Sequence, residues 1–289
     1  MSIRNPVEWS VDQFRHTLFG VEESASRGLL QAEEDTRLPL PAVRRIKVAD
    51  LKDVLARGAG DFGANRTDVL FLCALYPIIG LVLISFVAEY KMLPLLFPLA
   101  SGFALIGPVV GIGLNEMSRR RELGFGQGWT DAFGVLRSPS LGAIILLALL
   151  LTGIFLLWMV TAYLIYDLTL GPLPPDSIRS FLHDVFRTSA GHALIVLGVG
   201  VGFIFAAVVL VISVVAFPLL LDRGVGVEVA VRTSVQAART NPGPVALWGL
   251  IIAAGLVLGS IPVFVGLIVI LPILGHSTWH LYRKMVVSR

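Results

Sequence analysis

The sequence predicts an all-α polytopic membrane protein with six transmembrane helices. Two observations carry this prediction, namely five long segments without charged residues and a one-sided distribution of Lys and Arg. Of the 289 residues, 55% are hydrophobic and 15% are charged, and the mean hydropathy is +0.81. Soluble domains carry about 25% charged residues, so this composition is typical of a chain that lies largely in lipid.

The charge-free segments locate the membrane spans. They cover residues 69–88, 92–115, 138–166, 188–221 and 240–282, which are 20, 24, 29, 34 and 43 residues long. About 20 apolar residues cross a bilayer as a helix. The longest segment is too long for one crossing and must turn, and residues 259–262 (GSIP) are the best break because Gly and Pro disfavour helix continuation. We therefore expect spans at about 69–88, 93–115, 140–166, 192–217, 245–258 and 262–282.

The distribution of Lys and Arg predicts the orientation. In a six-span arrangement, 20 of the 23 basic residues lie on the side that holds both termini, and only Lys91, Arg179 and Arg187 lie on the other. Cytoplasmic segments of membrane proteins carry the excess of Lys and Arg. Both termini are therefore expected in the cytoplasm, and the sixth span is needed to keep Arg283 and Lys284 on that side.

Three regions are expected along the chain. Residues 1–47 form a polar cytoplasmic segment, residues 48–285 the six-helix membrane domain, and residues 286–289 a cytoplasmic tail. Segments that read as short interfacial helices precede each pair of spans, at 48–66, 124–137 and 224–239. Three repeated helical hairpins would explain this pattern, and so would the chance recurrence of Gly, Pro and terminal Arg.

On the side opposite the termini, residues 171–175 (GPLPP) predict a rigid loop. Asp176 or Ser177 can then cap a helix. The apolar residues that follow recur at helical spacing, at Ile178, Phe181, Leu182, Val185 and Phe186. This stripe fits a helix on the membrane surface and, equally, an extension of the fourth span.

The middles of the spans contain essentially no ionisable side chains, which argues against a proton pump or an ion-coupled transporter that uses a buried acid. The polar groups near span ends are Glu89, Asn115, Glu116, Asp167, His192, Asp222, His276 and His280. His276 and His280 are four residues apart, a spacing that can bind a metal or haem. Trp279 and Tyr282 beside them favour an interfacial aromatic belt instead, so we expect no bound metal or cofactor.

A run of arginines follows the second span. Glu116 and Arg120 have the i, i+4 spacing of a helical ion pair. Arg119, Arg120 and Arg121 can attract anionic lipid headgroups, or serve only as a topology anchor. Among the acids near span ends, Glu116 and Asp222 are the ones expected to approach the two histidines.

Four stretches of the sequence carry a family resemblance. They are 102–108 and 113–122 (GFALIGP and GLNEMSRRRE), 217–223 (FPLLLDR) and 271–283 (LPILGHSTWHLYR), with a weaker match at 44–46. Together they make residues 44–285 similar to a bacterial family of predicted integral membrane proteins of unknown function. Asn115 stands where that pattern has an aromatic residue. The resemblance implies a bacterial inner-membrane location, and it assigns no activity, so no catalytic role carries over from it.

No nucleotide-binding loop, nucleophile motif or cysteine cluster is present, so we expect a protein that is not an enzyme. A structural, assembly or accessory membrane component is the first hypothesis. The alternatives are a transporter or channel for a lipid or small solute, and a haem- or metal-binding redox protein. The expected partners are the lipid bilayer and other membrane proteins. The basic residues gather at helix ends, where topology explains them, so nucleic acid is not expected as a partner.

Overall fold

The computed structural model describes residues 40–64, 85, 93–125, 129–173, 175–262 and 264–287. These residues form helices and their connections, with one isolated antiparallel β-bridge between Val43 and Val286. In chain order the elements are α2 (Asp50–Ala64), η1 (Leu93–Leu95), α5 (Leu96–Val110), α6 (Ile112–Glu122), η2 (Trp129–Arg137), α7 (Leu141–Thr169), α8 (Ile178–Arg187), α9 (Ser189–Ser213), α10 (Ala216–Arg223), α11 (Val227–Thr240), α12 (Pro242–Ser260) and α13 (Leu267–Met285).

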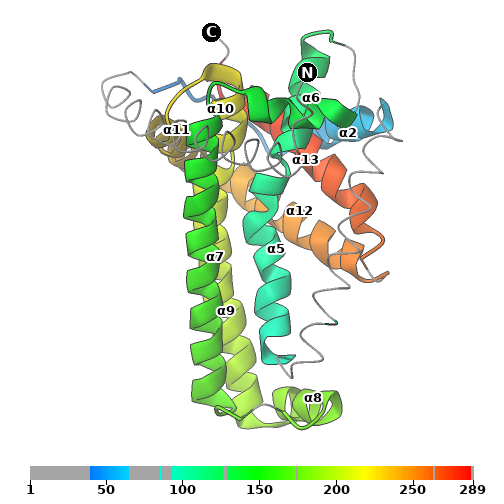
Figure 1. The fold of residues 1–289 in the computed structure, drawn as a ribbon, viewed down its shortest axis with the longest axis vertical. Helices are drawn as coiled ribbons and strands as arrows, with labels where there is room; N and C mark the ends of the chain where they lie inside the picture. Colours follow the sequence, from blue (N-terminus) through cyan, green and yellow to red (C-terminus); the bar gives the residue numbers. More distant parts are fainter. Residues whose placement is uncertain are drawn as a thin grey trace, which may run out of the picture.

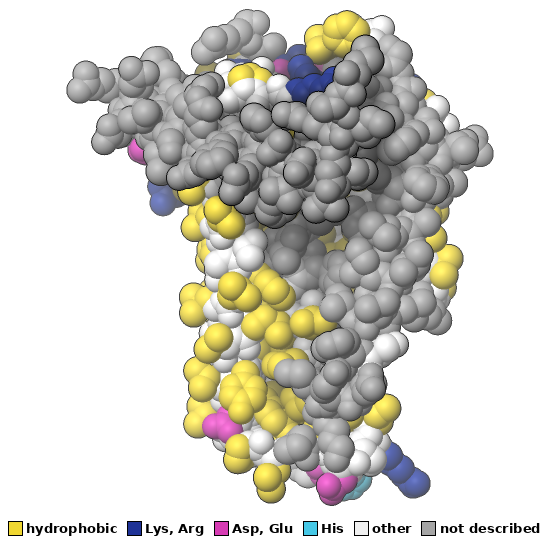
Figure 2. Space-filling model, in the orientation of Figure 1, with side chains coloured by type: hydrophobic (Ala, Val, Ile, Leu, Met, Phe, Trp, Pro, Cys, Tyr) yellow, Lys and Arg dark blue, Asp and Glu magenta, His cyan; other side chains and the backbone are white. Residues whose placement is uncertain are grey.

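Three of the described helical segments are long and apolar enough to cross a membrane. They are α7, the continuous run Ser189–Arg223 formed by α9 and α10, and α12. The 29 residues of α7 extend about 43 Å, against a hydrocarbon core of about 30 Å. Large apolar side chains such as Phe203 (67% exposed) and Leu168 (83%) face outward. Figure 2 shows hydrophobic side chains on the part of the long shaft that is not drawn in grey. These segments agree with the third, fourth and fifth predicted spans.

The remaining predicted spans differ from these three. Apart from Ser85, the first lies outside the described residues. The second is divided at Gly111 into α5, which contains Pro108, and α6. The sixth corresponds to α13, whose first half is apolar and whose second half contains two histidines, Arg283 and Lys284. The predicted break between the fifth and sixth spans is confirmed, since α12 ends at Ser260 and α13 begins at Leu267.

The connecting elements gather at the two ends of the long helices (Figure 1). The end drawn at the top holds α2, α6, α10, α11 and the C-terminal end of α13, and the opposite end holds η1 and α8. Ser177 rather than Asp176 caps α8, in a reciprocal capping box with Ser180. The extended backbone of Thr188 separates α8 from α9, so α8 is a distinct helix and does not extend the fourth span.

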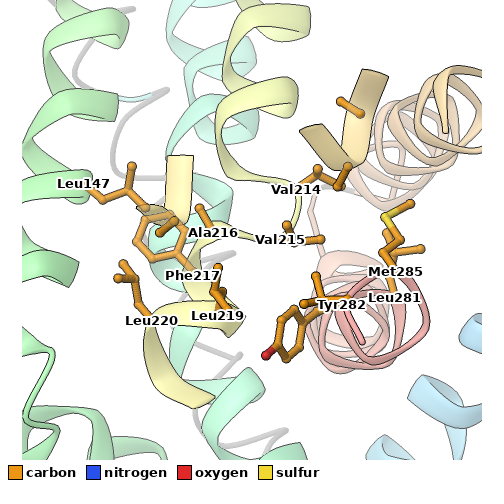
Figure 3. Close-up of a cluster of buried hydrophobic side chains, with 14 of the residues drawn as sticks. Leu147, Val214, Val215, Ala216, Phe217, Leu219, Leu220, Leu281, Tyr282 and Met285 are labelled. Atoms are coloured by element: carbon orange, nitrogen blue, oxygen red, sulfur yellow. The ribbon is translucent and has the colours of Figure 1, made fainter. Parts of the chain in front are cut away.

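Buried apolar side chains join the long helices to the end that holds α2, α6, α10 and α11, which we call the polar end. Figure 3 shows Phe217 and Leu220 of α10 beside Leu147 of α7, with Tyr282 of α13 nearby, and all four are at most 1% exposed. The other members of this cluster include Val214, Val215, Ala216, Leu219, Leu281 and Met285. The short helix α10 therefore carries the core from the membrane hairpin of α7 and α9 to α13.

Helix α2 lies directly on the second half of α13. Its buried residues Leu51, Val54, Gly58 and Asp61 follow one helical face. The segment before α2 also pairs with the end of α13 through its backbone. The Arg44 amide donates to the Met285 carbonyl at 2.7 Å, and the Val287 amide donates to the Ala42 carbonyl at 3.0 Å. The segment at 40–47, which was expected to belong to a polar tail, therefore packs on the C-terminal residues.

The Asn241 side chain holds the same segment from another side. Its Oδ1 accepts from the Ile46 amide at 2.7 Å, and its Nδ2 donates to the Arg44 carbonyl at 3.1 Å. Asn241 lies between α11 and α12 and is 2% exposed. Residues near both termini are thus tied to the start of the fifth predicted span.

The contact between α2 and α13 requires a glycine. A methyl group at Gly58 would lie 2.7 Å from the Ser277 amide nitrogen, 2.8 Å from the Ile273 carbonyl oxygen and against Ser277 Oγ. We therefore expect Gly58→Ala to lower the free energy of unfolding by about 1–3 kcal/mol, as overpacked sites do. The unfolding midpoint of the detergent-solubilised protein measures this.

Gly63→Ala is the matched control, because the same methyl group on the same helix would have no atom of the described residues within 4 Å. It should leave the midpoint unchanged or raise it slightly, since alanine favours a helix over glycine by about 0.5–1 kcal/mol. Equal behaviour of the two variants would show that α2 does not rest on α13 as described.

Candidate functional site

A buried carboxylate at the polar end joins three helices. Asp61, in the last turn of α2, is 7% exposed. Its Oδ2 accepts from Ser118 Oγ of α6 at 2.6 Å and from His280 Nε2 of α13 at 2.9 Å. Its Oδ1 accepts from Arg121 Nη1 at 2.8 Å. We call Asp61, Ser118, Arg121, His276 and His280 the Asp61 network.

The hydrogen bonds of the Asp61 network fix the position of a proton on His276. The single Ser118 hydroxyl proton is donated to Asp61, so Ser118 Oγ acts as the acceptor towards His276 Nδ1, which lies 2.8 Å away. His276 Nδ1 must then carry its proton. The ring is fully buried, and its Nε2 has no hydrogen-bond partner within the described structure. His276 is thus held as one defined tautomer.

The donors around Asp61 favour its ionised form. Burial alone would raise the pKa of the carboxyl group, but the hydrogen bonds from His280 and Ser118 outweigh it and hold the pKa below the ordinary value of 3.8. Asp61 is therefore a carboxylate at neutral pH. An ionised acid with three donors from two other helices locks α2 to α6 and α13.

A pocket of about 460 Å³ opens beside the Asp61 network. It is lined by Arg57, Asp61, Ser118, Arg121, Glu122, His280 and Arg283, together with the backbone of Gly60. Glu122 accepts from Trp279 Nε1 at 2.8 Å and from Arg283 Nε at 3.0 Å, which ties the end of α6 to α13 a second time. The charged groups that line this pocket are therefore largely paired with one another.

The arginines after the second predicted span separate into two groups. Glu116, which is 3% exposed, accepts from Arg119 Nε at 2.7 Å and Arg119 Nη2 at 2.8 Å, and from Arg120 Nε at 2.9 Å. Arg121 instead contacts α2, where it donates to the Asp61 carboxylate and the Gly60 carbonyl. The predicted pair of Glu116 and Arg120 is confirmed, and Arg119 pairs with the same carboxylate.

The structure corrects the interpretation of the histidines. His276, Trp279 and Tyr282 are at most 1% exposed, so they pack inside the protein and do not form an interfacial belt. The expectation that Glu116 and Asp222 are the acids that approach them was also wrong for His280, which binds Asp61. The sequence did contain a signal for Asp61, because it continues the helical stripe of Leu51, Val54 and Gly58.

The two histidines do not converge on one point. His276 Nδ1 binds Ser118, whereas His280 Nε2 binds Asp61. Among the residues that the structure describes, no three His, Cys, Asp or Glu side chains are placed to hold a metal ion. Of the other predicted polar groups, Asp167 and His192 lie near the opposite end, in the last turn of α7 and the first turn of α9, and Glu89 is outside the described residues.

We expect Asp61→Asn to lower the free energy of unfolding by about 2–3 kcal/mol at neutral pH. The amide replaces one acceptor with a donor, and a buried donor without a partner costs about 1–3 kcal/mol. Because the native pKa is depressed, the carboxylate stabilises the fold at neutral pH, and this contribution is lost as the pH falls below about 3.8. Unfolding midpoints of both proteins should therefore differ at pH 7 and converge in acid.

Asp53→Asn is the control on the same helix, because Asp53 is half exposed and pairs with Arg57 and Lys284 at the surface. Solvent screens exposed pairs strongly and they contribute little to stability, so this variant should remain close to wild type. A wild-type midpoint for Asp61→Asn at pH 7 would contradict the role given to the carboxylate.

Comparison with known proteins adds one match. No curated protein and no solved structure matches the chain. Residues 96–222 match a family described as "Predicted integral membrane protein (DUF2189)". The match extends from α5 to the end of α10 and includes Ser118 and the three arginines, whereas Asp61, His276 and His280 lie outside it. Together with its apolar helices, this match identifies the chain as an integral membrane protein whose residues 96–222 are similar to this family.

Proposed function

We propose that the protein is a non-catalytic component of a bacterial cytoplasmic membrane, with six transmembrane helices, both termini in the cytoplasm, and a structural, assembly or accessory role. The observation that carries the proposal is that two helix breaks among the described residues, between α5 and α6 and between α9 and α10, are closed by the protein's own groups. In transporters, interrupted helices expose backbone groups to a substrate or ion near the middle of the membrane. The two breaks here do not.

The break between α9 and α10 is closed by α11. Ser234 Oγ donates to the Val211 carbonyl at 2.8 Å and accepts from the Val215 amide at 3.4 Å. Val214 and Val215, which form the break, are 3% and 0% exposed and belong to the main apolar core. The backbone groups freed by the break are thus bound within the protein, and the space around them is filled with apolar side chains.

The break between α5 and α6 is closed in a similar way. The Gly111 amide still donates to the Gly107 carbonyl at 2.8 Å, and the Asn115 amide donates to the Gly111 carbonyl at 3.0 Å. A methyl group at Gly111 would lie 4.0 Å from Gly275 Cα of α13, so two glycines face each other there. Close helix packing, which small residues permit, explains this break without a substrate.

The outward faces of the long helices leave room for partners in the membrane. Val196 and Phe203 of α9 and Val257 of α12 are 71%, 67% and 64% exposed. Such side chains contact lipid or the helices of another membrane protein. With the polar end held together internally, these faces support an accessory role better than they support a transport path.

Photo-crosslinking in native membranes, combined with reconstitution, tests the proposal. A photoreactive amino acid at Val196, Phe203 or Val257 should give a protein adduct of discrete mass from at least one position. The buried Leu147, which is 0% exposed, is the control position and should give only intramolecular products. The purified protein in vesicles should show no solute flux or lipid exchange above empty vesicles.

The opposite pattern would favour the second hypothesis. Lipid adducts alone at all three exposed positions, together with flux that requires the protein, would make it a transporter or channel. A Soret band or one equivalent of metal in the purified protein, lost in His276→Ala or His280→Ala, would instead support the redox hypothesis.

The proposed orientation makes a separate prediction. In a Cys73→Ala background, Asp176→Cys should react with a membrane-impermeant maleimide in intact cells, because the loop before α8 faces outward. Leu123→Cys after α6, Gln236→Cys in α11 and a cysteine appended after Arg289 should react only after the cells are opened. The unequal distribution of Lys and Arg is the physical reason. Labelling of the appended cysteine in intact cells would refute the six-span topology.

A further inference from the structure

A second pocket at the polar end has the composition of an anion site. It has a volume of about 450 Å³ and lies between α6, η2, the start of α7 and the end of α10. Four arginines line it, Arg119, Arg120, Arg137 and Arg223, against two acids, Glu116 and Asp222. The lining thus carries two more positive than negative groups. The first pocket, beside Asp61, has a more balanced set of charges.

The protein itself holds these arginines in place. Glu116 orients Arg119 and Arg120 through three hydrogen bonds, and Gly134 makes room for Arg120, whose Nη2 would lie 2.9 Å from a methyl group at that position. Arg223 has a side chain that is 9% exposed and donates to the Val287 carbonyl. Fixed guanidinium groups lose little side-chain entropy when they bind a ligand, which favours recognition of a phosphate.

Arg137 supplies a positive charge that no acid among the described residues neutralises. It ends η2, its side chain is exposed, and it forms no ion pair with any residue that the structure describes. Arg120 Nη2 and Arg137 belong to different elements, α6 and η2, that pack against each other around Gly113 and Ala132. An anionic ligand between the two elements would therefore contact both Arg137, which has no ion-pair partner among the described residues, and Arg120, which Glu116 orients.

The start of α7 adds to the positive potential. Ser138 and Pro139 line the pocket, and α7 begins two residues later with an N-cap, Ser140, that makes no side-chain capping hydrogen bond. Ser140 Oγ is buried without a partner in the described structure, and it lies close to Gly224, another lining residue. The dipole of a long helix places partial positive charge at its first turn, which favours an anion nearby.

The position of the pocket along the long helices indicates where its ligand lies. The apolar sequence of α7 starts at Leu141, directly after Pro139, and the apolar run of α9 and α10 ends at Asp222 and Arg223. The pocket is therefore level with the polar boundary of the membrane-spanning helices, where phospholipid phosphates lie.

From these observations we infer that the pocket between α6, η2, α7 and α10 binds a phosphate group, presented by an anionic lipid headgroup or by a free phosphate. Arg119, Arg120 and Arg137 contact the phosphate oxygens, and Glu116 acts as the positioning residue that orients the first two. The site does not depend on the accessory role proposed above, because a transporter with this structure would contain it as well.

Lipid retention by the full chain tests the inference. The protein is placed in nanodiscs of mixed phosphatidylglycerol and phosphatidylcholine, and the lipids that remain bound are counted by native mass spectrometry. Arg137→Gln should weaken phosphatidylglycerol retention about fivefold, the effect expected for one basic group near anionic headgroups. Arg137→Lys should retain most of the binding, because it keeps the charge.

Arg57→Gln is the matched control. It removes one exposed positive charge from the polar end but lies in α2, outside this pocket. Its retention of phosphatidylglycerol should be close to wild type. An equal loss in Arg57→Gln and Arg137→Gln would show that only the overall charge of this end matters and would overturn the inference.

A second measurement separates the two sources of phosphate. Inorganic phosphate is added to the protein in lipid-free detergent micelles, with chloride at matched ionic strength as the reference, and the unfolding midpoint is followed. If phosphate raises the unfolding midpoint of the wild-type protein but not that of Arg137→Gln, the site binds free phosphate. If phosphatidylglycerol is retained selectively and phosphate leaves the midpoint unchanged, the site binds the lipid headgroup. Neither effect in the wild-type protein would overturn the inference.

Discussion

The polar end of this protein depends on two carboxylates that are buried and must be paired. Asp61 is held by donors from α6 and α13, and Glu116 is held by Arg119 and Arg120. An unpaired buried charge is costly, and removing one partner of a buried pair commonly destabilises a protein by about 3–5 kcal/mol. This requirement fixes the relative positions of three helices, and both pockets at this end are bounded by side chains that the two acids hold in place.

The membrane helices could be predicted from the sequence because their signal is local. A long run of residues without charge indicates that a helix is surrounded by lipid. For this reason α7, α9 with α10, and α12 lie close to the expected ranges. The turn after Ser260 was also predictable from Gly and Pro. The division at Gly111 was not expected, since the segment around it remains apolar throughout and only the packing against Gly275 explains why a break is tolerated.

The Asp61 network could not be assembled from sequence, because its members are far apart. Asp61 and His280 are separated by 219 residues, and Ser118 lies between them in a helix of its own. The spacing of His276 and His280 suggested a shared ligand, yet each ring binds a different acceptor or donor. The arginine run shows the same difficulty. Arg119 and Arg120 follow Glu116 by three and four residues and share its helix face, whereas Arg121 follows by five residues and is rotated about 140° away from it.

The docking of α2 on α13 has a consequence for biosynthesis. Translation proceeds at roughly 5–20 residues per second, so α2 leaves the ribosome roughly 10–40 s before the α13 residues that bury it. Its apolar face, with Leu51 and Val54, and the carboxylate of Asp61 have no native partner from α13 during that interval. Helix α13, which is synthesised after the other described helices, is thus the one that closes the polar end. A ribosome that stops before Gly275 leaves a chain in which the hairpin of α7 and α9 is present while the apolar face of α2 still lacks its cover from α13.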